Sequence, residues 1–156
     1  MKVSIITVCY KSAATIEGTI QSVLNQTYSD IEYLVIDGQS TDETLQIVRK
    51  YENEIATILS EKDKGMYDAI NKGIQLCTGD VVGVLNADDF YIDNKVIEEV
   101  VSKMRNENAD SLYSDLYYVA TEDTNKVIRN WVSGKYDRQK FLYGWMPPHP
   151  TFFVKK

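Results

Sequence analysis

Residue types that build many enzyme sites are scarce in this chain. It contains 1 histidine, His149, and 2 cysteines, Cys9 and Cys77. These are too few for a zinc site of cysteine and histidine ligands or for a disulfide framework. No run approaches the roughly 20 apolar residues that cross a bilayer, and the apolar stretch after Met1 is too short for a signal peptide. We therefore expect a cytoplasmic protein that is, at most, peripheral at the inner face of the cytoplasmic membrane.

Positive charge is also in short supply. Lysine and arginine number 17 against 23 aspartates and glutamates, which gives a net charge of -6 at pH 7. This acidic balance argues against nucleic acid as a partner. With 44% hydrophobic and 26% charged residues in a length of 156, the chain has the composition of a globular protein of one domain.

The glycine-rich turns of common nucleotide sites are missing as well. The turn after the first predicted strand reads Tyr10-Lys11-Ser12-Ala13-Ala14. It is neither the Gly-x-Gly-x-x-Gly of a dinucleotide site nor the Gly-Lys-Ser/Thr of a P-loop. No Gly-x-Ser-x-Gly elbow of a serine hydrolase occurs. That strand end also carries no carboxylate, which excludes a phosphatase with an aspartyl nucleophile.

The first half of the chain does contain alternating strand and helix patterns. Apolar, β-branched runs predict strands at 3–9, 31–36, 55–59 and 81–85. Apolar residues recur between them at helical spacing: Ile16, Ile20, Val23 and Leu24, then Leu45 and Val48, then Met66, Ala69, Ile70 and Ile74. Segment 40–43, Ser-Thr-Asp-Glu, has the form of a capping box before the second helix. This alternation predicts an α/β fold with a mainly parallel, Rossmann-like central sheet flanked by helices.

The second half follows a different pattern. A helix carrying Val96, Ile97, Val100, Val101 and Met104 comes first. Strands are then predicted at 111–120 and 126–132, around a polar turn at 122–125. We expect a smaller α+β portion here, ending in an aromatic, proline-containing segment at 145–150.

Ligands bind a parallel sheet at the carboxyl ends of its strands. The residues after the predicted strands are Tyr10 and Lys11; Asp37, Ser40 and Asp42; Asp63 and Lys64; and Asn86, Asp88 and Asp89. Asp88 and Asp89 offer the oxygen ligands that hold Mg²⁺ or Mn²⁺ against a diphosphate. The alternative is that segment 86–89 is only a polar turn between a strand and a helix.

Other residues also have two interpretations. Asp37 either accepts a hydrogen bond from a nucleobase on which Tyr10 stacks, or serves the fold alone. Asp42 is explained by a helix start without any ligand. Lys64 either pairs with a diphosphate or is solvated, and His149 is either a loop residue between prolines or has a role at a ligand or acceptor site.

Together, these segments resemble the family 2 glycosyltransferases with the GT-A fold, in particular bacterial members that build O-antigen or capsular polysaccharide. The matching segments are 3–8 with Tyr10, 22–27, 37–42, 61–65 with 67–73, and 86–89. Segment 148–153, Pro-His-Pro-Thr-Phe-Phe, adds a weaker match.

The resemblance implies a nucleotide-diphospho-sugar donor, for which we expect a UDP-sugar, and a divalent cation, Mg²⁺ or Mn²⁺. It implies an inverting transfer to a saccharide or lipid-linked saccharide acceptor in cell-surface polysaccharide biosynthesis. By this resemblance, the substrate-binding residues are Thr7, Val8, Tyr10 and Asp37 for the base, Asp63 and Lys64 for the rest of the nucleotide, and Asn86 with Ala87. The resemblance also implies that the metal is bound by Asp88 with Asp89. Asn86 stands where the family more commonly has an aspartate.

The family's general base is an acidic residue some way after the Pro-His segment, whereas this chain stops at Lys156. We therefore expect 1–156 to be a single GT-A domain truncated at its acceptor end, with the catalytic base beyond Lys156. Two alternatives are a noncatalytic module that binds a nucleotide-sugar and a sugar nucleotidyltransferase. The latter would need a glycine-rich, basic loop after its first strand.

Overall fold

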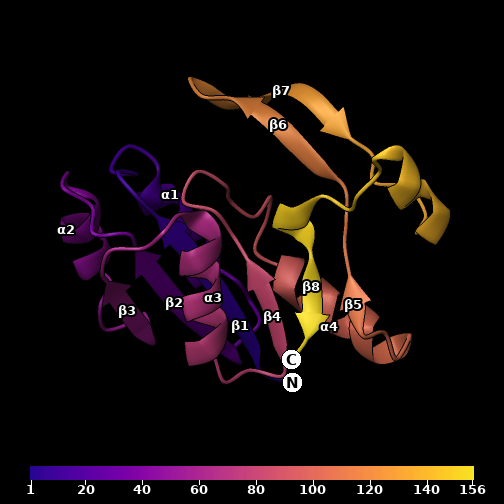
Figure 1. Cartoon of the computed structure of the whole chain (residues 1–156), viewed down its shortest axis with the longest axis horizontal. Helices are drawn as coiled ribbons and strands as arrows, with labels where there is room; N and C mark the ends of the chain where they lie inside the picture. The colour runs from indigo at the N-terminus through magenta and orange to yellow at the C-terminus, as the bar shows by residue number, and fades with distance from the viewer.

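The computed structural model describes all residues, 1–156, and is built around a six-stranded sheet (Figure 1). The strand order is β3-β2-β1-β4-β8-β5. The strands are β1 (Val3–Cys9), β2 (Ile31–Asp37), β3 (Thr57–Ser60), β4 (Val81–Val84), β5 (Ser111–Leu112) and β8 (Phe153–Lys155). Strands β1 to β4 are parallel, whereas β8 is antiparallel to both of its neighbours. The predicted α/β fold with a mainly parallel central sheet is confirmed.

Four helices cover the two faces of this sheet: α1 (Ile16–Leu24), α2 (Thr44–Arg49), α3 (Met66–Leu76) and α4 (Val96–Asn106). Successive residues of β1 point to opposite faces, so Ile5 packs in the core shared with α1 and α4, and Ile6 in the core under α3. Gly73 allows α3 to lie close to β1, because a Cβ atom there would be 2.5 Å from Cγ2 of Ile6. No helix of the chain is long and apolar enough to cross a bilayer.

The second half differs from the prediction in where its strands lie. The predicted strand 111–120 is divided into β5 and β6 (Leu116–Ala120), which belong to different sheets. The backbone N–H of Ser114 donates to Oγ1 of Thr151 (3.0 Å), and Asp115 accepts from the backbone N–H of Ser133 (2.8 Å). These hydrogen bonds divert the chain out of the main sheet between the two strands.

Strand β6 pairs with β7 (Asp123–Trp131) in a hairpin that stands away from the main sheet (Figure 1). Strand β7 begins earlier than the predicted strand 126–132, so most of the predicted turn at 122–125 is strand. Two 3-10 helices follow, η1 (Arg138–Tyr143) and η2 (His149–Thr151). Strand β8 was not predicted. It lies against β4 because Gly83 has no side chain: a Cβ atom there would be 2.5 Å from Cε1 of Phe153.

The predicted capping box at the start of α2 is wrong. The helix begins at Thr44, and the hydroxyl of Ser40 donates to Asp37 instead of capping it. The N-cap residue is Glu43, and Asp42, just before it, binds the first helical residue: its Oδ1 accepts from the hydroxyl (2.6 Å) and the backbone N–H (3.2 Å) of Thr44. These hydrogen bonds lower the pKa of Asp42. Ser40 is lost as a cap because a buried carboxylate lies within its reach.

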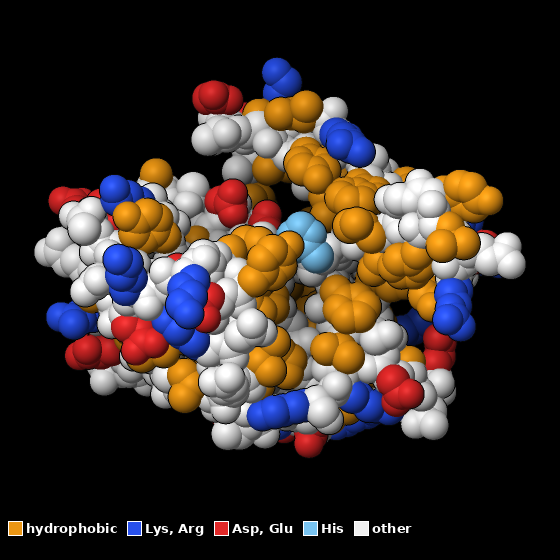
Figure 2. Space-filling model, viewed as in Figure 1, with side chains coloured by type: hydrophobic (Ala, Val, Ile, Leu, Met, Phe, Trp, Pro, Cys, Tyr) orange, Lys and Arg blue, Asp and Glu red, His pale blue; other side chains and the backbone are white.

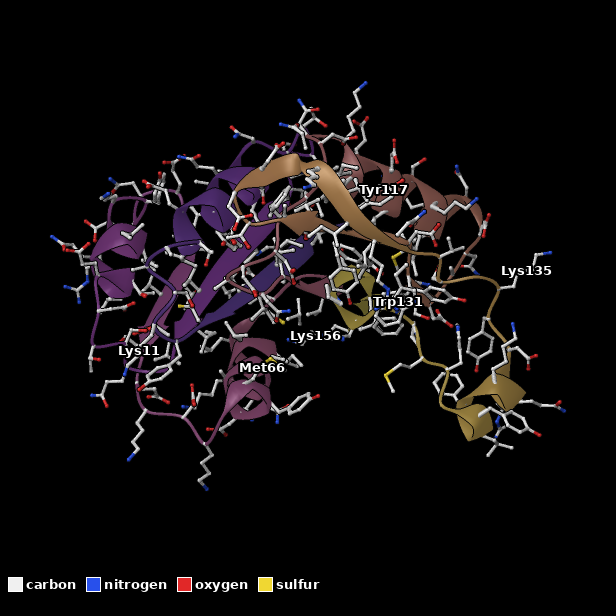
Figure 3. All side chains as sticks on the ribbon, turned by 90° about the horizontal axis from the view of Figure 1, so that it is seen from above. Lys11, Met66, Tyr117, Trp131, Lys135 and Lys156 are labelled. Atoms are coloured by element: carbon white, nitrogen blue, oxygen red, sulfur yellow. The ribbon has the colours of Figure 1, made fainter.

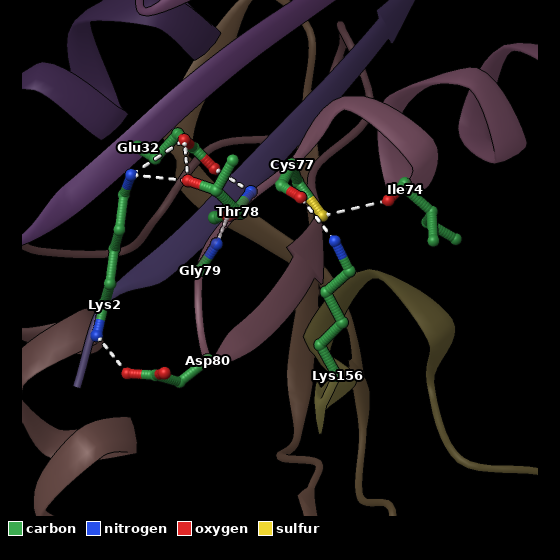
Figure 4. A network of polar contacts seen from close by, with 9 residues as sticks. Lys2, Glu32, Ile74, Cys77, Thr78, Gly79, Asp80 and Lys156 are labelled. Atoms are coloured by element: carbon green, nitrogen blue, oxygen red, sulfur yellow. Dashed lines mark hydrogen bonds and ion pairs between the residues drawn. The ribbon is translucent and has the colours of Figure 1, made fainter.

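A cluster of polar contacts joins the strands at the opposite, amino-terminal edge of the sheet (Figure 4). Glu32, near the start of β2, accepts from Nζ of Lys2 (2.8 Å), Oγ of Ser4 (2.6 Å), and both the backbone N–H and the hydroxyl of Thr78 (2.6 Å each). We call these four residues the Glu32 clamp. They tie β1, β2 and the turn before β4 together, and Lys156 bonds to the same turn, so the two chain ends lie close together (Figure 1).

Candidate functional site

The candidate site is built on a buried carboxylate at the end of β2. Asp37 is 0% exposed. Its oxygens accept hydrogen bonds from the backbone N–H (3.1 Å) and the hydroxyl of Ser40, and from the hydroxyl of Ser60 (2.6 Å). The thiol of Cys9 also donates to it at 3.7 Å, and burial together with the nearby Asp37 raises the pKa of that thiol. Asp37 therefore holds together the segments that leave β1, β2 and β3.

This burial bears on the predicted contact between Asp37 and a base. All the hydrogen bonds to Asp37 come from the chain itself, so a base would have to displace one of these donors. Asp37 acts on the surface of the site through Ser40, whose hydroxyl accepts from the backbone N–H of Lys11 (2.9 Å). The geometry thus gives Asp37 the part of a positioning residue, while direct contact with a base stays a prediction.

Three residues beside Asp37 form an open surface, which we call the platform: Tyr10, Gly38 and Asp63. A Cβ atom on Gly38 would lie 2.5 Å from Oδ2 of Asp63 and 3.4 Å from Cδ2 of Tyr10, so both side chains meet over this glycine. The ring of Tyr10 is exposed, with Nζ of Lys11 5.3 Å from its centroid. Oδ1 of Asp63 accepts from the backbone N–H of Gly65 (2.8 Å), which leaves Oδ2 facing the platform.

The other predicted nucleotide-site residues are divided between surface and core. Lys64 is exposed next to Asp63, and its backbone N–H bonds to Asp68 at the start of α3 (3.0 Å). Thr7 and Val8 are buried in β1, and the hydroxyl of Thr7 accepts from that of Tyr33 (3.0 Å). Their side chains therefore face the core, so a role in base binding would depend on their backbone.

The predicted metal residues lie in the turn after β4, residues 86–89, which we call the acidic turn. The backbone N–H of Asp89 donates to the carbonyl of Asn86 (3.0 Å), and Nδ2 of Asn86 donates to Oδ2 of Asp89 (2.9 Å). Ala87 is buried and Asp88 is exposed. Oδ1 of Asn86 is buried and has no hydrogen-bond partner. The turn thus presents one open carboxylate and one unused amide oxygen.

His149 comes to this turn from the far end of the chain. Because β8 is antiparallel to β4, the residues before β8 lie at the same edge as the residues after β4, and η2 contacts β4. Burial raises the pKa of Asp89; the hydrogen bond from Asn86 and the charge of His149 oppose this shift. Figure 2 shows the exposed histidine in the hollow between the two halves of this face, with acidic side chains beside it.

The donor set of the acidic turn suits a hard divalent cation. Carboxylate and amide oxygens are the ligands that Mg²⁺ and Mn²⁺ take, and Asn86, whose Oδ1 is unpartnered, stands two residues before Asp88 in the same turn. No group of three or more His, Cys, Asp or Glu side chains in the chain could hold a metal ion by itself. Asp88 and Asn86 therefore suit a metal ion whose remaining ligands would be oxygens of a bound substrate. Asp89 is hydrogen-bonded to Asn86.

Two residues of the site were not singled out by the sequence patterns. Gly38 matters because only hydrogen fits between Tyr10 and Asp63, and the Asp-Gly pair at a strand end was the available signal. Ser60 binds Asp37 from the end of β3, and no pattern in the sequence marks it.

Solved structures of other proteins share this fold. S. aureus TarS 1-349, in complex with UDP-GlcNAc, superposes with a TM-score of 0.76 at 21% identity, over 99% of this chain and 45% of that one. Mannosyltransferase PcManGT from Pyrobaculum calidifontis, in complex with GDP-Man and Mn²⁺, gives 0.67 at 23% identity, over 80% and 37%. The fold is the GT-A fold that the sequence resembles.

Curated relatives are more similar in sequence. The PGL/p-HBAD biosynthesis glycosyltransferase of Mycobacterium tuberculosis is 31% identical over 157 residues, 98% of this chain and 59% of its own. The Escherichia coli protein WfaP, named a UDP-Glc:alpha-D-GlcNAc-diphosphoundecaprenol beta-1,3-glucosyltransferase, is 33% identical over 116 residues, 74% of this chain and 46% of its own. The chain thus spans about half the length of the curated relatives it matches. The pattern of glycosyl transferase family 2 matches residues 4–154, and the chain belongs to that family.

Proposed function

We propose that the carboxyl edge of the sheet binds a UDP-sugar, and that the chain serves transfer of the sugar, with inversion, to a hydroxyl of a saccharide or lipid-linked saccharide. The observation that carries this proposal is that the platform and the acidic turn share one sheet edge. The platform suits a base, and the acidic turn suits a diphosphate with its cation. The name of WfaP, which gives UDP-Glc and alpha-D-GlcNAc-diphosphoundecaprenol, and the UDP-GlcNAc in complex with TarS support it.

Each platform residue has a distinct part in base binding. The exposed ring of Tyr10 offers a face on which a base stacks. Oδ2 of Asp63 is free to accept a hydrogen bond, and a uracil ring carries one N–H donor between two carbonyls. Asp37 positions the platform through Ser40 and Lys11.

The acidic turn would hold the diphosphate end of the donor. Asp88 and Oδ1 of Asn86 would be the first ligands of Mg²⁺ or Mn²⁺, with Asp89 beside them. A bound divalent cation neutralises the charge that develops on the departing diphosphate. Lys64, which has no salt-bridge partner in the chain, would pair with a phosphate oxygen from the start of α3.

Calorimetry of UDP binding, with Mn²⁺ and with EDTA, tests the proposal. We expect tighter binding with Mn²⁺. Asp88→Asn should remove most of that difference, because it replaces the open carboxylate with a neutral amide. Tyr10→Ala should weaken UDP binding on the order of tenfold in either buffer, since it removes only the stacking surface.

Asp110→Asn is the matched control for Asp88→Asn. Asp110 is an exposed carboxylate at the amino-terminal edge of the sheet, paired with Lys155 (2.9 Å), so the control should leave UDP binding unchanged. Equal UDP affinity in Mn²⁺ and EDTA would refute the metal site. Unchanged UDP affinity in Tyr10→Ala would refute the platform. An assay of sugar transfer from a UDP-sugar to a saccharide acceptor then distinguishes the two functions: an enzyme transfers the sugar, whereas a noncatalytic module only binds the donor.

A further inference from the structure

The exposed apolar side chains of this protein are concentrated in one segment. Of the 18 large hydrophobic residues that are exposed, 10 lie between residues 117 and 146. Leu142 and Tyr143, in η1, are the most exposed of all, at 84% and 89%. We call the exposed side chains of residues 117–146 the hairpin surface. Figure 2 shows hydrophobic side chains gathered on this part of the molecule, with basic side chains around them.

The charge of the hairpin surface is opposite to that of the whole chain. Its basic residues are Lys126, Arg129, Lys135, Arg138 and Lys140, and its acidic residues are Glu122, Asp123 and Asp137. The segment is therefore positive, although the chain carries a net charge of -6. A positive, apolar surface on an acidic protein fits an anionic partner that is itself partly apolar.

The hairpin surface rests on a packed aromatic cluster. The ring of Trp145 meets those of Tyr113 (6.0 Å), Tyr136 (6.3 Å) and Phe141 (5.2 Å) edge to face, and its Nε1 donates to the carbonyl of Ser133 (3.0 Å). This cluster holds η1 in place. The exposed residues Leu142 and Tyr143 are therefore carried on a fixed element and need no rearrangement to contact a partner.

The position of the surface relates it to the candidate site. The hairpin stands above the carboxyl edge of the sheet in the first view (Figure 1). Seen from above, it lies across the same edge, with Tyr117 and Trp131 on it and Lys135 farther out (Figure 3). A flat partner that rests on the hairpin surface would thus lie near the carboxyl edge of the sheet, where the acidic turn is.

We propose that the hairpin surface docks onto the headgroup region of an anionic lipid bilayer. Tyrosine and tryptophan rings with aliphatic neighbours insert at the boundary of headgroups and acyl chains, and basic side chains pair with anionic headgroups. The apolar side chains sit on projecting elements, η1 and the hairpin, which suits a flat, deformable surface. The proposal goes beyond the proposed function and needs neither the donor nor a metal.

Co-sedimentation of the 156-residue chain with vesicles tests the proposal. We expect binding to vesicles that contain phosphatidylglycerol, weaker binding to phosphatidylcholine alone, and release from the anionic vesicles at high salt. Leu142→Ser with Tyr143→Ser should reduce binding to both kinds of vesicle. Lys135→Glu should reduce binding to the anionic vesicles alone, by at least about fivefold for the loss of one basic residue.

Matched controls lie outside the hairpin surface. Ile92→Ser removes an apolar side chain that is 69% exposed, and Lys95→Glu reverses an exposed charge. Both should leave vesicle binding unchanged, and so should Asp88→Asn, which tests the donor site separately. Binding that falls equally in variants and controls would overturn the proposal. So would a concentration-dependent dimer that Leu142→Ser with Tyr143→Ser abolishes while vesicle binding is unchanged, because a second copy of the chain would then be the occupant.

Discussion

Removing the charge of Glu32 should lower the unfolding free energy by more than the loss of an exposed ion pair would, although Glu32 lies at the amino-terminal edge of the sheet. Its side chain is only 10% exposed and accepts four hydrogen bonds in the Glu32 clamp. Burial raises the pKa of this carboxyl, but the hydrogen bonds from Lys2, Ser4 and Thr78 outweigh burial and lower it from 4.5 to about 2. Glu32→Gln keeps the size of the side chain and removes the charge that these donors stabilise.

The pKa shift gives the magnitude and the pH range of this effect. A pKa lower in the folded than in the unfolded chain means that the ionised carboxyl contributes stability above the unfolded pKa, and that this stability is lost as the pH falls toward the folded pKa. The change in pKa corresponds to about 3 kcal/mol. We therefore expect Glu32→Gln to cost about 2 to 3 kcal/mol of unfolding free energy at neutral pH, and the parent protein to lose the same amount between about pH 5 and pH 2.

Urea unfolding followed by circular dichroism, at neutral and at acid pH, measures both quantities. Glu107→Gln is the matched control: Glu107 also pairs with a lysine, Lys103, at 2.8 Å, but its side chain is 59% exposed. An exposed pair of this kind contributes at most about 1 kcal/mol. If the two variants lose the same unfolding free energy, or if the stability of Glu32→Gln falls at acid pH as much as that of the parent, the charge of Glu32 is not what stabilises the clamp.

Three further substitutions and one control, Gly18→Ala, test the site and the core. Asp37→Ala should lower the melting temperature and weaken UDP binding together, because it leaves buried hydroxyl donors unpaired, at a cost of about 1 to 3 kcal/mol; loss of affinity alone would mean direct contact with the base. Gly38→Ala should weaken UDP binding with little change in melting temperature, since its Cβ would displace only the end of the Asp63 side chain. Gly73→Ala should cost about 1 to 3 kcal/mol in urea unfolding by overpacking the core; Gly18→Ala, whose Cβ would meet nothing within 4 Å, should instead be neutral or stabilising.

The parallel half of the sheet could be predicted because local pattern and tertiary position agree there. Every residue of β1, Val3–Cys9, is buried, and a strand covered on both faces is typically a nearly continuous apolar, β-branched run, interrupted here by Ser4. The helix α3 shows the limit of this agreement. Its position was predicted, but Met66 and Ile74 of its expected apolar face are exposed, while Ala69 and Gly73 make the close contacts with the sheet.

The candidate site could be predicted as a set of residues but not as a set of roles. Asp37 and Asp63 both stand after strands in the sequence. Only the fold shows that Ser40 and Ser60 bury the first carboxylate, whereas the second meets Tyr10 over Gly38. A hydrogen bond between residues on different strands depends on the register of the sheet, which single-strand patterns do not determine.

The antiparallel strand β8 explains why His149 could not be placed from the sequence. A three-residue strand carries too short a pattern to recognise, yet its direction decides which edge the preceding residues reach. A parallel β8 would have put His149 at the amino-terminal edge, beside the Glu32 clamp. The antiparallel pairing with β4 puts it beside Asp89 and below the hairpin, between the acidic turn and the hairpin surface. A ligand that contacts both the acidic turn and the hairpin surface would therefore lie next to His149.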